Sequence, residues 1–253
     1  MNHSSVIRTG LAAASLALSV AVPTSVAFAA QVDDMPNRPA IEVTREDVAK
    51  SNEKVGMAYS ALISMWTNDF NQIGQHFYAP RIARYSRAVM TACGPIGTNN
   101  AEYCPRNNTI YYDEVFVAGM AKTAASALST DGDMAGLGIV AHEMGHAVAI
   151  QLGHESRSSY DNESTADCLA GAFAEQSKRD GSLEKGDVEE AFYGMSLAGD
   201  PTPEPTGNAR RDAMIQARLA RQSHGTKEQR MDNFRAGLDG GAKACLDELH
   251  GVK

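Results

Sequence analysis

Two histidines and a glutamate lie close together in the sequence, in the order His142-Glu143-Met144-Gly145-His146. In a helix, the two imidazoles project from one face and both reach one metal ion at about 2.0 Å. Glu143 projects beside them, where its carboxylate can contact a water molecule without binding the metal. Gly145 leaves room for another element to approach. The pattern predicts a catalytic zinc site with Glu143 as general base; the alternative is a pair of ordinary core or surface histidines.

A catalytic zinc site needs a third protein ligand. The extended motif that supplies a third histidine is absent, because Ala149 and Leu152 stand where it requires Gly and His. Glu163 is the better candidate, since it opens a further predicted helix. Asp167 follows four residues later on the same face and can accept the second N–H of one histidine. The alternative is that both acids only stabilise the first turns of a helix.

The helices that position these side chains are visible in the sequence pattern. The helix with the histidines is expected to begin near Asp131 or Asp133, and Gly153 is typical of a stop after Leu152. Apolar side chains recur along it at helical spacing. A further helix, which carries the two acids, is expected to begin near Asn162.

Other elements are expected on both sides of this pair. A long helix begins after Thr44, an N-cap with Asp47 in place of the usual capping-box glutamate, and extends to about Tyr78. Residues 109–112 form a β-prone run. Three prolines between residues 201 and 205 indicate an irregular connection, and a second capping box at 226–229 opens a late helix. The predicted fold is mainly helical α+β, a zincin-like single catalytic domain with a small β-sheet over residues 44–250.

The N-terminus has the features of a secretory signal. Arg8 is followed by an apolar run over residues 11–22, and Ala27-Phe28-Ala29 is a small-x-small cleavage site. We therefore expect a cleaved signal peptide at residues 1–29, a flexible tail at residues 30–43 and a mature chain outside the cytoplasm. An uncleaved anchor is the alternative. The rest of the chain has no stretch apolar enough to cross a bilayer.

The four cysteines fit an oxidising compartment, where disulfides persist. Of the three possible pairings, we favour a local bridge from Cys93 to Cys104, because these residues bracket a loop rich in Gly, Pro and Asn. Cys168 then pairs with Cys245. The alternative is that Cys168 is a small buried residue that stays free.

The charge balance excludes some partners. The chain has a net charge of -8 with only 23 lysines and arginines, which argues against nucleic acid or an anionic membrane as the main partner. A peptide or protein substrate is consistent with the predicted zinc site.

Several segments together resemble the neutral zinc metallopeptidase family, exported or membrane-anchored bacterial proteins of the gluzincin type. The resemblance is carried by H-E-x-G-H, by E-x-x-A-D-C-x-A-G after it, by the cysteine-bracketed loop with Ile110-Tyr111-Tyr112-Asp113, and by H-G-T-x-x-Q-R from His224. It covers about residues 44–248 and implies one zinc per chain. It implies that the zinc ligands are His142, His146 and Glu163. It also implies that Glu143 is the catalytic base.

The sequence departs from this family in two places. Glu102 stands where the family favours an aromatic residue before Tyr103, and residues 201–221 match nothing in the family pattern. Both departures concern substrate contacts and leave the metal ligands unaffected.

The predicted reaction is hydrolysis of a peptide bond by a zinc-activated water, with Glu143 moving the proton. A developing oxyanion needs one more donor, for which Tyr111, Tyr112, Arg230 and His224 are candidates. We prefer His224, which precedes a capped helix, although an ordinary loop histidine is the alternative. The strand near Tyr111 is expected to pair with an extended substrate. A zinc hydrolase of cell-wall peptides and a non-catalytic, zinc-stabilised binding protein remain alternative functions.

Overall fold

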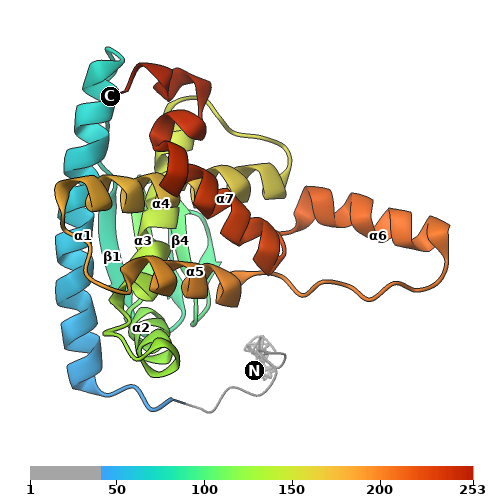
Figure 1. Cartoon of the computed structure of the whole chain (residues 1–253), viewed down its shortest axis with the longest axis horizontal. Coiled ribbons are helices and arrows are strands. Elements are labelled where there is room, and N and C mark those ends of the chain that lie inside the picture. The colour runs from blue at the N-terminus through green and yellow to red at the C-terminus, as the bar shows by residue number, and fades with distance from the viewer. Residues whose placement is uncertain (1–40, 253) are drawn as a thin grey trace, which may run out of the picture. The chain divides into compact units, whose positions relative to one another are not determined.

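Helices make up most of the computed structural model, which describes residues 41–252 (Figure 1). The predicted signal peptide lies outside the described residues, as does the predicted tail up to residue 40. The α-helices in the described part are α1 (Arg45–Gln72), α2 (Glu114–Leu128), α3 (Asp133–Gln151), α4 (Ser159–Asp180), α5 (Asp187–Ala198), α6 (Ala209–Gln222) and α7 (Lys227–Gly240). Two short 3-10 helices follow, η1 (Ala242–Ala244) and η2 (Asp247–Gly251).

The strands are short and lie between α1 and α2. They are β1 (Arg81–Tyr85), β2 (Val89–Met90), β3 (Pro95–Ile96), β4 (Ala101–Cys104) and β5 (Thr109–Asp113). The prediction of a mainly helical α+β fold with a small sheet is confirmed. The assignment of residues 44–250 to one catalytic domain stays a prediction.

The main sheet has the strand order β1-β5-β4. β5 pairs in parallel with β1 and antiparallel with β4, so the strand predicted at residues 109–112 is the central one. Both of its edges are therefore occupied, and the expectation that the strand near Tyr111 pairs with a substrate is wrong. Within the main sheet, β4 is the edge strand that packs against α3.

Helix α1 begins as predicted and ends earlier. The backbone N–H of Asp47 donates to the Thr44 hydroxyl at 3.2 Å, and the backbone N–H of Thr44 donates to the Asp47 carboxylate at 2.7 Å, which completes the capping box. The helix ends at Gln72 and not near Tyr78, because Gly74 adopts a φ of 72°, which is incompatible with helix continuation. The inner face of α1 contributes Leu62, Trp66 and Phe70 to the core, among other residues.

Helix α3 is the central element of the core. It packs against α1, α2, α4, α5 and the main sheet, and most of its residues are buried. It begins at Asp133 and is followed by Gly153 with a φ of 83°, as the sequence predicted. Because apolar neighbours surround this helix, the polar side chains of His142 and Glu143 in its middle are buried too.

Helix α4 crosses α3 closely at Gly145. A β-carbon at position 145 would lie 2.8 Å from the Ala166 carbonyl oxygen, so only glycine permits this approach. The helix begins at Ser159, three residues before the predicted Asn162, because the Ser158 hydroxyl accepts the Asp161 backbone N–H at 3.3 Å. The close crossing brings the first turns of α4 alongside the histidines of α3.

Both predicted disulfides are present. Cys93 joins Cys104, which ties the β2–β3 region to the end of β4. Cys168 joins Cys245, so the alternative of a free buried Cys168 is wrong. The second bridge links α4 to the chain that follows α7, and these two helices already pack tightly against each other. The capping box predicted at the start of α7 is confirmed.

Several elements were not predicted from the sequence, namely α2, α5, α6 and four of the strands. Residues 201–206 are irregular, as the three prolines indicated. In Figure 1, α6 extends away from the other helices, and none of its described residues is buried. Among the residues that the structure describes, no helix combines the length and the apolar character needed to cross a membrane.

Candidate metal centre

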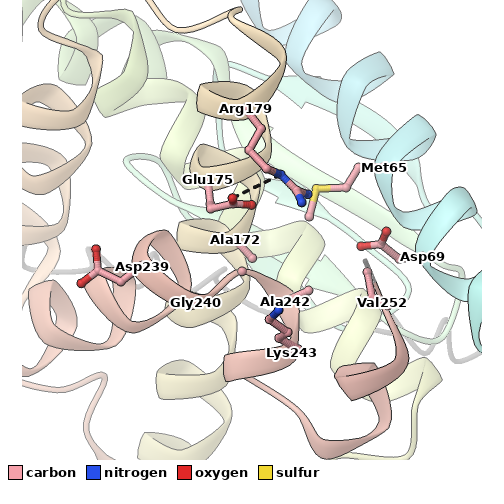
Figure 2. Close-up of a pocket in the computed structure, with 11 residues that line it drawn as sticks. Met65, Asp69, Ala172, Glu175, Arg179, Asp239, Gly240, Ala242, Lys243 and Val252 are labelled. Atoms are coloured by element: carbon pink, nitrogen blue, oxygen red, sulfur yellow. Dashed lines mark ion pairs between the residues drawn. The ribbon is translucent and has the colours of Figure 1, made fainter.

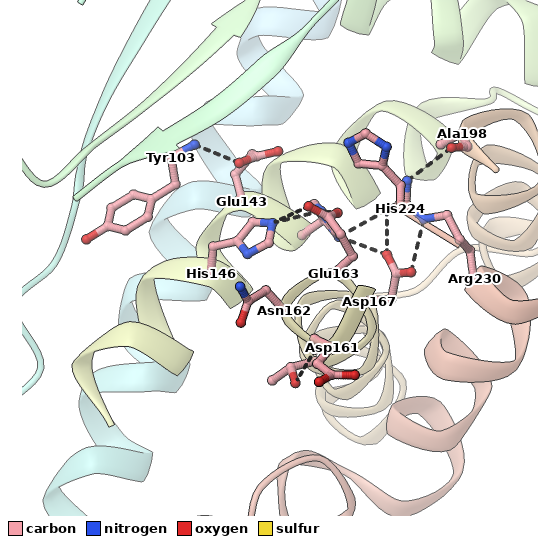
Figure 3. Close-up of polar contacts among 12 residues, drawn as sticks. Tyr103, Glu143, His146, Asp161, Asn162, Glu163, Asp167, Ala198, His224 and Arg230 are labelled. Carbon is pink, nitrogen blue, oxygen red and sulfur yellow. Dashed lines mark hydrogen bonds and ion pairs between the residues drawn. The ribbon is translucent and has the colours of Figure 1, made fainter. Parts of the chain in front are cut away.

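Three potential metal ligands come together where α3 and α4 cross. His142 and His146 project from α3, and Glu163 projects towards them from the beginning of α4 (Figure 3). The two Nε2 atoms are 3.1 Å apart. Glu163 Oε2 lies 3.0 Å from His142 Nε2, and Glu163 Oε1 lies 3.6 Å from His146 Nε2. These are the three metal ligands predicted from the sequence.

The spacing of these donor atoms suits zinc. Four ligands at 2.0–2.1 Å around a tetrahedral ion are separated from one another by about 3.3 Å. The observed separations of 3.0, 3.1 and 3.6 Å, of which the first and last involve the two different oxygens of Glu163, lie close to this value. Two imidazoles and one carboxylate are also the donor types of a catalytic zinc site with an open fourth position. The residues present therefore fit a zinc ion without rearrangement of the helices.

Glu143 lies beside this cluster and is held by the sheet. Its Oε2 accepts the backbone N–H of Tyr103 in β4 at 2.7 Å. Glu143 is 7% exposed, and burial raises the pKa of its carboxyl to about 7, against the opposing effect of His142. A carboxylate with this pKa can accept a proton at neutral pH and release it again. The contact with Tyr103 was not predicted, because it joins residues 40 positions apart.

Asp167 orients one of the histidines. Its Oδ1 lies 2.8 Å from His142 Nδ1, which leaves His142 Nε2 directed at the other donors. Asp167 is completely buried and also accepts two hydrogen bonds from Arg230 of α7, at 2.6 and 3.0 Å. The position of Asp167 behind a histidine was predicted from the sequence, whereas its contact with Arg230 was not.

The pKa values of the ligand side chains reflect mutual contact. Burial lowers the pKa of His142, but the hydrogen bonds and charges of Asp167 and Glu163 outweigh it and raise the value to about 10. Burial, followed by the charge of His142, lowers the pKa of His146 to about 4. Burial raises the pKa of Glu163, but its contact with His142 dominates and brings it to about 2. A metal ion binds neutral imidazole, so it would compete with the proton on His142.

The candidates for an oxyanion donor differ in the hydrogen bonds that their side chains already make. Arg230 is engaged with Asp167 and with the Ala198 carbonyl oxygen, and it is 6% exposed. The Tyr112 hydroxyl donates to Asn52 of α1, and the Tyr111 hydroxyl accepts from Asn107.

His224 is the candidate with an exposed side chain close to the metal ligands. The exposed fraction of its side chain is 60%, and its charge helps to lower the pKa of Glu163. Arg230 and Tyr112 already donate hydrogen bonds within the fold, whereas the ring of His224 is exposed.

A separate pocket lies on another part of the molecule. It is lined by side chains of α1, α4, α7 and the C-terminal segment, including Asp69 and the ion pair between Arg179 and Glu175 at 3.2 Å (Figure 2). The residues that line this pocket include neither Glu143 nor any of the three potential metal ligands. The pocket is therefore distinct from the candidate metal centre.

A histidine pair on one helix, a carboxylate from the next helix and a buried glutamate beside them are typical of zinc-dependent peptidases. A family model described as "Putative neutral zinc metallopeptidase" matches residues 9–249. The chain belongs to this zinc metallopeptidase family.

The relatives that match the chain have no established activity. The chain is 32% identical over 197 residues to the uncharacterized protein YpfJ of Escherichia coli strain K12. The matched region covers 71% of this chain and 64% of YpfJ. YpfJ of the E. coli O6:H1 strain CFT073 matches to the same extent. The chain therefore spans less than two thirds of the length of these relatives. No solved structure gives a significant match.

Proposed function

We propose that this protein is a secreted, zinc-dependent peptidase that hydrolyses peptide bonds of peptide or protein substrates. The observation that carries the proposal is the cluster of His142, His146 and Glu163, whose donor atoms lie 3.0–3.6 Å apart, with the buried carboxylate of Glu143 beside it. A purely structural zinc site needs neither an open position nor a general base. The family membership supports the same reaction class.

In this proposal His142, His146 and Glu163 hold one zinc ion. When bound, the ion would act as a Lewis acid that acidifies a water molecule and polarises the scissile carbonyl group. Glu143 accepts the proton of the attacking water and delivers it to the nitrogen of the leaving amine as the C–N bond breaks. The hydrogen bond from Tyr103 holds the Glu143 carboxylate in position for both transfers.

His224 is proposed as the donor to the oxyanion that develops on the carbonyl oxygen. Its backbone N–H donates to Asp200 at 2.8 Å, and its Nδ1 lies 3.5 Å from the same carboxylate. These contacts fix the loop that precedes α7 while the ring stays exposed. An extended substrate is proposed to lie along the edge strand β4, next to Glu143. Export through the predicted signal at residues 1–29 belongs to the same proposal.

Replacement of Glu143 by Gln tests this function. The zinc-loaded parent protein should cleave an unstructured protein or members of a peptide library, and a chelator should stop the cleavage. Glu143→Gln should retain one zinc per chain and cleave at least about 100-fold more slowly, because the general base is lost. The matched control is Glu228→Gln, an exposed glutamate on α7, which should cleave like the parent.

Cell-wall peptide fragments belong in the same assay. Cleavage of these fragments alone would replace the peptidase proposal by a cell-wall hydrolase. Glu143→Gln activity equal to the parent's would contradict the role of Glu143. A zinc-loaded parent that cleaves neither kind of substrate would favour a non-catalytic, zinc-stabilised binding protein.

A further inference from the structure

A second group of acidic side chains lies at the beginning of α3, apart from the zinc-site residues. One lies in the turn before α3, one is the first residue of α3, and two lie in the first turn of α5. One carboxylate oxygen from each lies within 4.8 Å of the others. The four residues are Asp131, Asp133, Asp187 and Glu190.

Asp187 has a buried oxygen that no protein group satisfies. The side chain is 4% exposed, and one of its oxygens, Oδ2, accepts the backbone N–H of Glu184 at 2.7 Å. The other, Oδ1, has no hydrogen-bond partner within the described part of the chain. Thr130 Oγ1 is buried and unpaired in the same way, and this side chain packs next to Gly186. Buried polar atoms normally have a partner, and a bound ion or water molecule would supply the one that Asp187 Oδ1 lacks.

The charges in this cluster are incompletely balanced. Lys54 of α1 lies 2.6 Å from Asp133 and 3.6 Å from Asp131, which sets one positive charge beside a cluster of four carboxylates. The oxygens of Glu190 accept the backbone N–H groups of Gly132 and Met134, at 2.9 and 3.0 Å. Each carboxylate oxygen has a further lone pair, so these bonds still permit a contact with a cation.

The raised pKa of the Asp187 carboxyl is consistent with this excess of negative charge. Burial, together with the negative charges of Asp133 and Glu190, raises the pKa of its carboxyl to about 6. A cation bound at the cluster would offset that repulsion.

We propose that this cluster is a calcium site that fastens the beginning of α3 to α5. Four carboxylates without histidine or cysteine are a hard donor set, which favours calcium over zinc. Calcium binds oxygen at 2.3–2.6 Å, so two ligands on opposite sides of the ion are about 5 Å apart. The four carboxylates of the cluster lie close enough together to contact one such ion. Since α3 carries His142, Glu143 and His146, the ion would stabilise the helix on which the zinc site is built.

Thermal unfolding of the zinc-loaded protein tests the proposal. The protein is placed in a buffer freed of other divalent ions, and CaCl₂ is added up to about 10 mM, which covers the affinities of extracellular calcium sites. The unfolding temperature should rise by roughly 5–10 °C once calcium exceeds its Kd about 100-fold. MgCl₂ should have a smaller effect, because magnesium demands stricter geometry and keeps its water. No shift with calcium, or an equal shift with magnesium, would overturn the assignment.

Three variants locate the effect. Asp187→Asn should lose most of the calcium-induced shift and, without calcium, unfold at a higher temperature than the parent, because one repelling carboxylate is removed. Asp131→Asn, at an exposed position, should also weaken the shift without affecting folding. The exposed Glu189→Gln on α5 is the matched control and should keep the full shift. Zinc content should be unchanged in all three. If both aspartate variants retain the parent's shift, the calcium site lies elsewhere and the proposal is wrong.

Discussion

His142 is held from two sides, by the donor atoms around its Nε2 and by Asp167 at its Nδ1. Asp167 is held in turn by Arg230, whose guanidinium donates to both carboxylate oxygens. This chain of contacts fixes the orientation of the imidazole before any ion binds. Such support normally contributes about 10- to 100-fold to metal affinity.

Asp167→Asn should therefore weaken zinc binding by about 10- to 100-fold while leaving His142, His146 and Glu163 in place. The measurement is a competition titration with a zinc-sensitive chelator. Asp161→Asn is the control, because it removes the same charge from an exposed position on α4. Equal zinc affinity of Asp167→Asn and the parent would show that Asp167 does not orient the ligand.

Asp69 predicts a pH dependence of stability away from the metal. It is 6% exposed on α1, and burial raises the pKa of its carboxyl to about 6 from the ordinary 3.8 (Figure 2). The folded state therefore binds this proton more tightly than the unfolded state does. The folded protein loses stability as pH rises from about 4 to 6, by on the order of 2–3 kcal/mol in total.

Replacement of Asp69 by Asn should remove this loss. Relative to the parent, Asp69→Asn should unfold at a higher temperature at pH 7.5, and the difference should shrink at pH 4.5, where the parent's carboxyl is mostly protonated. Asp232→Asn, at an exposed site on α7, controls for the change in net charge. A difference that is the same at both pH values would show that ionisation of Asp69 does not cause it.

Among the elements, those with local sequence signals were the predictable ones. The positions of His142 and His146 on α3, and of Glu163 and Asp167 on α4, follow from helix periodicity. Capping boxes likewise located the starts of α1 and α7.

Contacts between distant segments left no such signal. Arg230 reaches Asp167 across 63 positions, and Tyr103 reaches Glu143 across 40. The missed helix α2 starts at an N-cap, Asp113, that is also the last residue of β5, so the helix signal directly adjoins the strand signal.

Helix α6 should be the least stable of the helices described between residues 41 and 252. None of its described residues is buried, and an irregular segment with three prolines precedes it. Brief digestion with trypsin should therefore cut first within residues 209–222, since exposed segments with few buried side chains open locally at low cost. The cut sites are read by mass spectrometry. First cuts at the exposed Arg179 of α4 or Lys227 of α7 would contradict this order.

At the scale of the whole molecule, the candidate zinc site depends on the packing of α3, α4, α7 and the main sheet. α3 provides two donors and the base, α4 provides the third donor and Asp167, α7 provides Arg230, and β4 holds Glu143. The disulfide between Cys168 and Cys245 fastens α4 to the segment after α7. The site is therefore a product of the tertiary fold, and any change that separates α3 from α4 should abolish it.

The most direct test of the account is an anomalous difference map from crystals of the zinc-loaded protein, measured on both sides of the zinc absorption edge. One peak per chain is expected, at about 2.0–2.1 Å from His142 Nε2, His146 Nε2 and a carboxylate oxygen of Glu163. A zinc peak that is bound by other residues, or the absence of any peak at these three side chains, would contradict the central claim.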